Sequence, residues 1–148
     1  MSREKRIELL LQVAEERGQE ATRALVQRRQ LLDEAGGRLN ELVDYRESCA
    51  RGGSAQDACL GASLRDHWRF LSRLNDAIAE QHGHIKQQRL AVEQSMERWQ
   101  EAQRQVTILE KVRDRVRAAE RRARERGEQR ASDDRRHGAS GVLAAEEA

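Results

Sequence analysis

The 148-residue chain contains no proline. Proline removes a helical hydrogen bond and clashes with the preceding turn, so its absence permits very long helices. The helical pattern stops at one segment, Ser48-Cys49-Ala50-Arg51-Gly52-Gly53-Ser54. We therefore predict a first helix over residues 3–48, a connection over 49–62 and a second helix over 63–126 or further, with a disordered tail over 138–148.

Apolar residues recur in steps of three and four along both predicted helices, which is the seven-residue repeat of a coiled coil. The first predicted seam comprises Leu11, Ala14, Ala21, Leu25, Leu32, Ala35, Leu39 and Leu42. The second comprises Leu64, Trp68, Leu71, Ile78, Ile85, Val92, Met96, Trp99 and Val106, with polar residues at Asn75, His82, Arg89 and Gln103. After Val106 the apolar residues change phase, continuing at Leu109, Val112 and Val116, which predicts a local irregularity.

Composition favours helices that share a narrow seam over a globular core. Charged residues make up 36% of the chain and aromatic residues 3%, and the mean hydropathy is −0.94. We predict an all-α fold, an antiparallel two-helix coiled-coil hairpin over residues 1–137 with a longer C-terminal helix. A parallel dimer of single long helices is the alternative. The glycine break, and small residues in the first seam facing bulky ones in the second, favour the hairpin.

The position of the turn determines which residues of the two helices face each other. A turn centred near residues 55–56 places Ile7 opposite about residue 104. The second helix beyond roughly residues 106–110 would then have no partner helix.

The sequence also bears on location. No apolar run is long enough to span a bilayer, and the N-terminal Met1-Ser2-Arg3-Glu4 has no signal-peptide core. We therefore expect a cytoplasmic or peripherally membrane-associated protein, in which Cys49 and Cys59 would be reduced.

We identify no catalytic residues, no metal ligands, no cofactor site and no small-molecule site. The histidines lack the spacing of a metal site, since His82 and His84, two residues apart, point to different sides of a helix. The chain has no phosphate-binding glycine loop. An enzyme is not expected.

Two surfaces are candidates for partner binding. The first contains Tyr45 and Phe70, the only tyrosine and phenylalanine, which both fall off the predicted seams. On the second helix Phe70, Leu74 and Ala77 recur along a face different from that of Leu71. An exposed apolar cluster of this kind is typical of a protein contact. Alternatively, the helices pack slightly rotated here and the two rings widen the core.

The second candidate is the arginine-rich end of the second helix. Eleven Lys/Arg and six Asp/Glu lie between Lys111 and His137. The alternatives are a solvated helix with many ion pairs, an acidic protein partner docked against the stripe from Leu109 to Ala123, and nucleic acid. The interleaved acidic residues and the absence of aromatic residues for base stacking weigh against nucleic acid.

Four stretches, in their order and spacing, resemble the bacterial flagellar FliJ family over roughly residues 1–137. They are Leu39–Arg46, Trp68–Leu71 leading to Ala77-Ile78, Leu109–Arg115 and Glu128–Asp134. The resemblance implies a non-enzymatic stalk and coupling component of flagellar type III protein export, at the cytoplasmic face of the inner membrane. Such a protein would insert into the hexameric export ATPase FliI, promote its assembly, contact the export gate protein FlhA and assist export chaperones. The equivalent stalk of a virulence type III secretion system, or a basic coiled coil that binds nucleic acid, are the alternative functions.

The resemblance also implies positions for these contacts. The gate contact would comprise Leu42, Tyr45, Phe70, Leu74 and Ala77. The ATPase contact would comprise Arg3, Arg6, Leu10, Arg113, Arg117, Arg121 and Arg124. The chain departs from the family pattern at Cys49, where an aromatic residue is common, and near Gln81, where a histidine is common.

Overall fold

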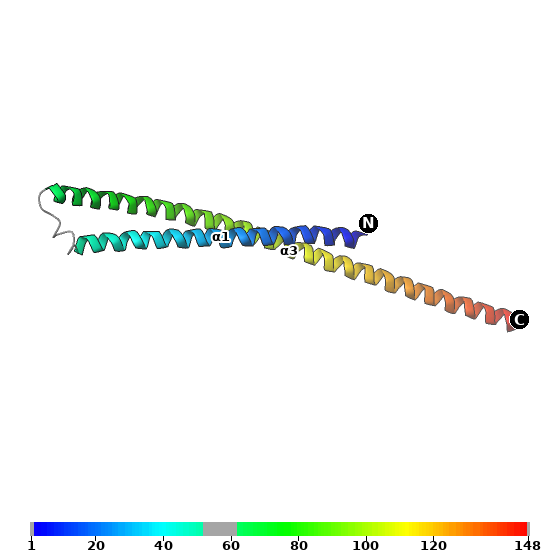
Figure 1. Cartoon of the computed structure of the whole chain (residues 1–148). Coiled ribbons are helices and arrows are strands. Elements are labelled where there is room, and N and C mark those ends of the chain that lie inside the picture. The colour runs from blue at the N-terminus through cyan, green and yellow to red at the C-terminus, as the bar shows by residue number, and fades with distance from the viewer. Residues whose placement is uncertain (1, 52–61, 148) are drawn as a thin grey trace. The chain divides into compact units, whose positions relative to one another are not determined.

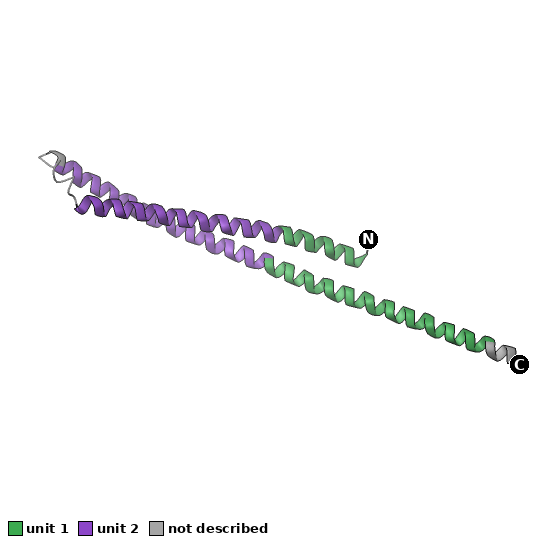
Figure 2. Cartoon of the chain, turned by 60° about the horizontal axis from the view of Figure 1, so that its bottom comes forward, with its two compact units in different colours: residues 1–16, 103–148 green, residues 17–102 purple. Residues whose placement is uncertain are grey.

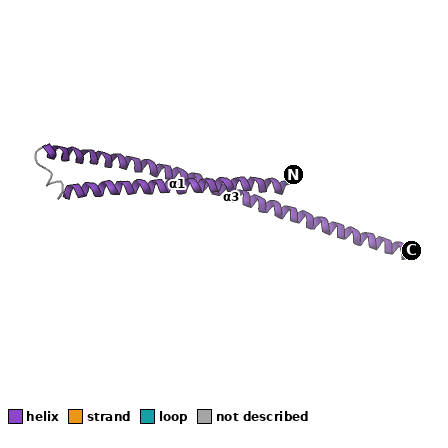
Figure 3. Cartoon of the chain, in the orientation of Figure 1, coloured by secondary structure: helices purple, strands orange, loops and turns teal. Residues whose placement is uncertain are grey.

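The protein, in a computed structural model, consists of two long α-helices, as the sequence predicts (Figure 1). The structure describes residues 2–51 and 62–147; the side chains of 62, 63 and 143–147 are outside this description, as are Cys59 and most of the predicted connection. Helix α1 spans Arg3–Arg51 and helix α3 spans Ala62–Glu147. Figure 3 shows helix throughout the described part of the chain. The predicted all-α class is confirmed.

Local sequence signals explain where α1 begins but not where α3 ends. Ser2 caps α1, since its Oγ accepts a hydrogen bond from the Lys5 amide at 3.3 Å. At the other end, α3 passes through Gly127 and Gly138 and continues to Glu147, where the sequence predicts a disordered tail from residue 138. A helical glycine costs only about 1 kcal/mol relative to alanine, and the neighbouring alanine, arginine and glutamate residues are good helix formers.

The chain divides into two compact units, each containing a segment of both helices (Figure 2). Unit 1 comprises residues 1–16 and 103–148, and unit 2 comprises residues 17–102. The sequence predicts a single unit over residues 1–137. In paired long helices each stretch contacts only the stretch level with it, so such a chain has no shared core to join distant parts.

Hydrogen bonds define the antiparallel pairing in unit 2. Trp99 Nε1 donates to Thr22 Oγ1 at 3.0 Å, and Arg46 Nη1 donates to Asn75 Oδ1 at 3.3 Å. Residue numbers on α3 therefore fall as those on α1 rise. The predicted turn would instead place Thr22 level with about residue 89, so the predicted register was wrong by about ten residues. The helix ends do not account for this difference, because α1 ends at Arg51 and α3 begins at Ala62, both close to the predicted ends.

Burial identifies the seam of α3 in unit 2. Its buried and half-buried side chains follow one repeat of four and three residues: His67, Leu71, Leu74, Ile78, Gln81, Ile85, Gln88, Val92, Ser95, Trp99 and Ala102. We assign heptad position a to Leu71 and its seven-residue repeats, and position d to Leu74 and its repeats. On α1, Leu11 then begins the a positions and Ala14 the d positions.

Seven of the nine apolar residues predicted for the α3 seam are buried or half-buried, and Leu64 and Trp68 are exposed. Of the predicted residues, Ile78 and Ile85 are buried, and Leu71, Val92, Met96, Trp99 and Val106 are half-buried. Trp68 is 65% exposed, so its assignment to the seam was wrong. The d position is Leu74 rather than Asn75, because a repeat of a residues alone does not determine which intervening residue turns inward. On α1, Leu25 is buried and Leu32 and Leu39 are half-buried, as expected.

The α3 seam of unit 2 is partly polar. Gln81 Nε2 donates to the Ala35 carbonyl oxygen of α1 at 2.9 Å, while Ser95 is 7% exposed. The Oε1 atom of Gln88 is buried with no hydrogen-bond partner, which costs free energy. Apolar residues at a alternate with these polar residues at d, so the helices are held mainly by one of the two core positions.

The contrast between Ile78 and Trp68 tests this seam. Ile78 is 5% exposed, so we expect Ile78→Ala to lower the free energy of unfolding by about 2–5 kcal/mol. Trp68→Ala removes a larger side chain, but an exposed one, and we expect a change within about 0.5 kcal/mol. Urea unfolding followed by circular dichroism measures both. A larger loss for Trp68→Ala would contradict the assigned seam.

Candidate protein-binding surfaces

The first surface lies beside the seam of unit 2 and contains the Tyr45 and Phe70 rings. The ring centroids are 5.8 Å apart with an interplanar angle of 87°, the edge-to-face contact that aromatic pairs prefer. Tyr45 on α1 and Phe70 on α3 both occupy heptad position g, so they meet across one edge of the seam. They are 55% and 41% exposed. The pairing therefore gives an ordered aromatic surface open to solvent.

The other predicted members of this surface lie deeper. Leu42 and Ala77 are half-buried, while Leu74 is only 7% exposed. Leu74 occupies a d position in the seam, so its predicted place off the seam was wrong. Tyr45 and Phe70, with Ala77 at the next g position of α3, form what we call the aromatic edge.

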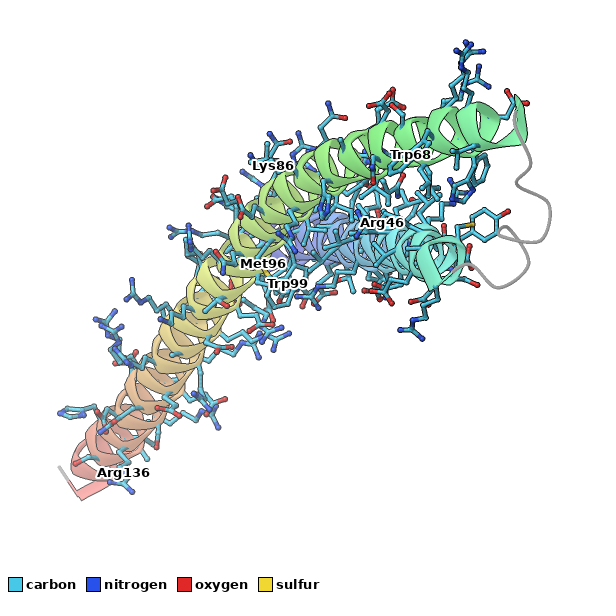
Figure 4. The ribbon with its side chains drawn as sticks, turned by 90° about the vertical axis from the view of Figure 1, so that its left-hand side faces the viewer. Arg46, Trp68, Lys86, Met96, Trp99 and Arg136 are labelled. Atoms are coloured by element: carbon cyan, nitrogen blue, oxygen red, sulfur yellow. The ribbon has the colours of Figure 1, made fainter. Side chains whose placement is uncertain are left out.

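The opposite edge of unit 2 carries a groove that the sequence did not indicate. Figure 4 labels Arg46 on α1 and Trp68 on α3, which both line it. The groove has a volume of about 370 Å³ and is lined by Arg46, Glu47, Ala50, Trp68, Leu71, Ser72 and Asn75. Trp68 occupies heptad position e, whereas Tyr45 and Phe70 occupy g. The two exposed aromatic groups therefore belong to different edges of the same pair of helices.

In unit 1 an arginine of α3 joins two glutamates of α1. Arg117 Nε donates to Glu4 Oε1 at 2.8 Å, and Arg117 Nη2 donates to Glu8 Oε1 at 3.1 Å. Glu4 and Glu8 are one helical turn apart, so one guanidinium reaches both. These ion pairs place the start of α1 level with Arg117. The predicted partner of this region lay near residue 104, which was too early in the chain.

The hydrogen bond from Arg117 lowers the pKa of the Glu4 carboxyl below its ordinary value, and a hydrogen bond with Glu120 lowers it further. The same contact with Glu4, followed by that with Glu8, raises the pKa of Arg117. A concavity of about 460 Å³ beside these residues is lined by Glu4, Asp114, Arg117, Glu120, Arg121 and Arg124. Both charge signs line it, as expected of an ion-pair network.

The predicted ATPase-contact residues in unit 1 fall into two groups. Arg3, Arg6, Leu10, Arg121 and Arg124 are exposed. Arg113 is half-buried at a seam position beside Asp114, and Arg117 is held by Glu4 and Glu8. The predicted phase change after Val106 was also wrong, because burial continues in steps of three and four. The unit 1 seam positions of α3 are Val106, Leu109, Arg113, Val116 and Glu120.

Helix α3 in unit 1 has no half-buried or buried residue from 121 to 142. Arg136, labelled in Figure 4, lies in this exposed stretch. Arginine is frequent there, and acidic residues are interleaved with it. The sequence predicts an unpartnered basic segment that begins at about residues 106–110. In the structure the fully exposed stretch begins at residue 121.

Sequence reasoning missed the Arg117 contacts and the Trp68 groove for the same reason. Glu4 and Glu8 are visible as a pair one turn apart, but their partner depends on the register of α3. Trp68 looked like a seam residue because it lies three residues before Leu71. The surplus of seam-like residues in this stretch, Leu64, Trp68, Leu71 and Leu74, was the available signal that one of them faces outward.

Two further properties concern the described residues as a whole. Over residues 2–51 and 62–147, no group of three or more His, Cys, Asp or Glu is arranged to hold a metal ion. No helix in these same ranges is long and apolar enough to cross a membrane.

The fold is that of a coiled-coil stalk, with helices paired along a thin seam and candidate binding surfaces along its edges. The family model described as "Flagellar FliJ protein" matches residues 3–139, and the chain belongs to this family. It is thus a stalk-like component of flagellar type III protein export. No curated protein and no solved structure matches the chain.

The ion pairs of Arg117 predict a titration that can be measured directly. Because the folded-state pKa of Glu4 is lowered, the contact stabilises unit 1 at neutral pH. This stabilisation is lost as the pH falls from the ordinary glutamate value of about 4.3 through the lowered one. Carboxyl-carbon NMR should show Glu4 titrating below that value, and Arg117→Gln should raise its pKa. The exposed Arg115→Gln is the control, and an equal effect of this variant would contradict the assignment.

Proposed function

We propose that the chain is a non-enzymatic stalk and coupling factor that binds the export ATPase FliI, promotes assembly of its ring and contacts the export gate protein FlhA. Family membership over residues 3–139 supports the export role. The observation that carries the ATPase contact is in unit 1, where α3 continues as an exposed arginine-rich helix beyond the residues level with the start of α1. A helix with all sides exposed is available to the inner surface of a ring.

For the ATPase contact, Arg113 and Arg117 have a different role from the other arginines. Arg121 and Arg124 are exposed on the concavity beside Glu4 and are direct contacts in this proposal, together with Arg3, Arg6 and Leu10. Arg113 and Arg117 are held by acidic neighbours within unit 1. The role of Arg117 is to hold the start of α1 against α3, so that both segments are presented together, whereas Arg113 pairs with Asp114 on α3 itself.

For the gate contact, the aromatic edge supplies the surface. Tyr45 and Phe70 are large, rigid and exposed, which suits a protein contact because few rotamers are lost on binding. Leu42 and Ala77 border the rings, and Leu74 supports them from the seam. Assistance to export chaperones is a further part of the proposal that rests on family membership alone. A location at the cytoplasmic face of the inner membrane is also part of the proposal, and the same family membership supports it.

The ATPase part is tested by mixing the chain with the cognate export ATPase and measuring hydrolysis and ring formation. We expect the full chain to raise both. A chain ending at Glu120 keeps the Arg117 ion pairs but lacks the exposed helix, and it should lose most of the effect. Arg121→Glu combined with Arg124→Glu should do the same. The matched control is Arg69→Glu with Arg73→Glu, two exposed arginines of α3 in unit 2.

Several outcomes would contradict this part. A folded, helical full chain without effect on the ATPase would do so, as would full activity of the chain ending at Glu120. Tight binding to DNA with a steep salt dependence, and no effect on the ATPase, would instead favour a nucleic-acid-binding coiled coil. If the chain replaced the stalk protein of a virulence type III secretion system, but not that of a flagellar system, the virulence function would be favoured.

The gate part is tested by Tyr45→Ala and Phe70→Ala. Because both rings are largely exposed, each variant should stay helical and lose no more than about 1.5 kcal/mol of stability through the ring contact. Binding to the soluble domain of the gate protein should weaken at least tenfold, and motility should fall. Leu90→Ala, at a residue of α3 that is 58% exposed, is the control. Loss of folding without a separate loss of binding would show that the rings act as core.

A further inference from the structure

Unit 1 exposes a group of aliphatic side chains that neither the seam nor the Arg117 ion pairs use. Leu9, Leu10 and Val13 of α1 are 50%, 56% and 45% exposed, and Ile108 of α3 is 53% exposed. Single exposed aliphatic residues are ordinary on protein surfaces, but a contiguous group is typical of a contact site. The question is whether these residues share one face.

The heptad positions place Leu10, Val13 and Ile108 on one edge, whereas Leu9 occupies position f, on the side facing away from the seam. Leu10 occupies position g and Val13 position c of α1, and Ile108 occupies position c of α3, with half-buried Val112 at g. Arg117 pairs with Glu4, so in an antiparallel pair of helices Val112 lies level with about Leu9 and Ile108 with about Val13. Positions g of the two helices meet across an edge, as Tyr45 and Phe70 do in unit 2. We call Leu10, Val13, Ile108 and Val112 the Leu10 strip.

Charge is distributed unequally over the two edges of unit 1. Over residues 3–16 and 103–122, positions g and c carry no acidic residue and four arginines: Arg3, Arg6, Arg115 and Arg122. Positions e and b of the same ranges carry the acids Glu8, Glu15, Glu110 and Asp114 among their charged residues. The Arg117 ion pair with Glu8 lies on that acidic edge. The Leu10 strip is therefore an apolar surface with a basic border.

We propose that the Leu10 strip is the docking site of an acidic amphipathic helix from a partner protein. An apolar stripe on that helix would cover Leu10, Val13 and Ile108, and glutamate or aspartate residues beside the stripe would face Arg3 and Arg115. Helices bind to apolar grooves in this way, with anchors spaced by three, four and seven residues. The charge border gives the binding its orientation and partner choice.

The charge and composition of the strip favour this occupant over two others. A second copy bound through the same face would bring the arginine borders of both copies together, which costs free energy. An anionic membrane would match the charge, but membrane-surface helices commonly carry aromatic anchors, and the strip has none. An acidic amphipathic helix would bury the apolar strip and form ion pairs with its arginine border.

The inference rests on the proposed function in one respect, because Arg3, Arg6 and Leu10 belong to the proposed ATPase contact. It specifies the face of unit 1 that binds and the chemistry of the segment that it takes. A peptide-binding test distinguishes this inference from the proposed function, because the strip can fail to bind an acidic peptide while the chain still stimulates the ATPase.

The probe is a fluorescently labelled, end-capped peptide of three heptads, with leucine at the seam positions and glutamate beside them. Fluorescence anisotropy with the full chain should show saturable binding that weakens as salt is raised. A peptide with lysine in place of every glutamate should bind at least tenfold more weakly. Leu10→Gln or Ile108→Gln should weaken binding of the acidic peptide about tenfold, and Arg3→Glu with Arg115→Glu should also weaken it.

The matched control is Leu90→Gln, because Leu90 lies on α3 in unit 2 and is as exposed as Ile108. It should leave peptide binding unchanged, and circular dichroism should show every variant helical. The proposal is overturned if neither peptide binds, if both bind equally, or if Leu90→Gln acts like Ile108→Gln. It is also overturned if Leu10→Gln abolishes dimerisation of the chain, or its binding to phosphatidylserine vesicles, while the acidic peptide has no effect.

Discussion

Each of two paired helices can bury only one stripe of its partner's surface. This limit determines both the thin core of the protein and the surfaces that stay exposed. No large side chain in the described part of the chain is fully buried, and the seam contains glutamine and serine beside isoleucine. Stability therefore depends on a short list of residues such as Ile78, Ile85 and Leu25, each buried by one partner helix. The same limit leaves both edges of every stretch open to solvent. In a globular core these side chains would be hidden; here they are the available binding surfaces.

The edges differ because the register decides which side chains meet across the seam. In unit 2 one edge carries the Tyr45 and Phe70 rings in edge-to-face contact, and the other carries the groove beside Trp68. In unit 1 one edge is closed by Arg117 with its two glutamates, and the other carries the Leu10 strip. The proposed contacts with the ATPase and the export gate would use such separate surfaces. Two helices with a fixed register supply them without any further fold.

Much of the seam was predictable, and the errors have one cause. Leu71, Ile78, Ile85, Val92 and Trp99 repeat every seven residues and were assigned correctly as seam residues. The residues between them were assigned one place too late, at Asn75 and His82, because polar Gln81 and Gln88 occupy the true positions. That single error also produced the apparent phase change after Val106 and the misplaced Trp68. A hydrophobic pattern cannot identify a core position that is filled by a polar residue.

The absence of proline, the seven-residue repeat and the family likeness were all readable from the sequence, since each depends on residue type and local spacing. So was the aromatic pair, because Tyr45 and Phe70 are unique in the chain. The length of the connection, the register and the partner of each charge were decided only by the tertiary structure. A shift of one heptad preserves every local preference of both helices while changing every contact between them. Contacts such as Arg117 with Glu4, which join residues far apart in the chain, therefore become visible only when the two helices are paired.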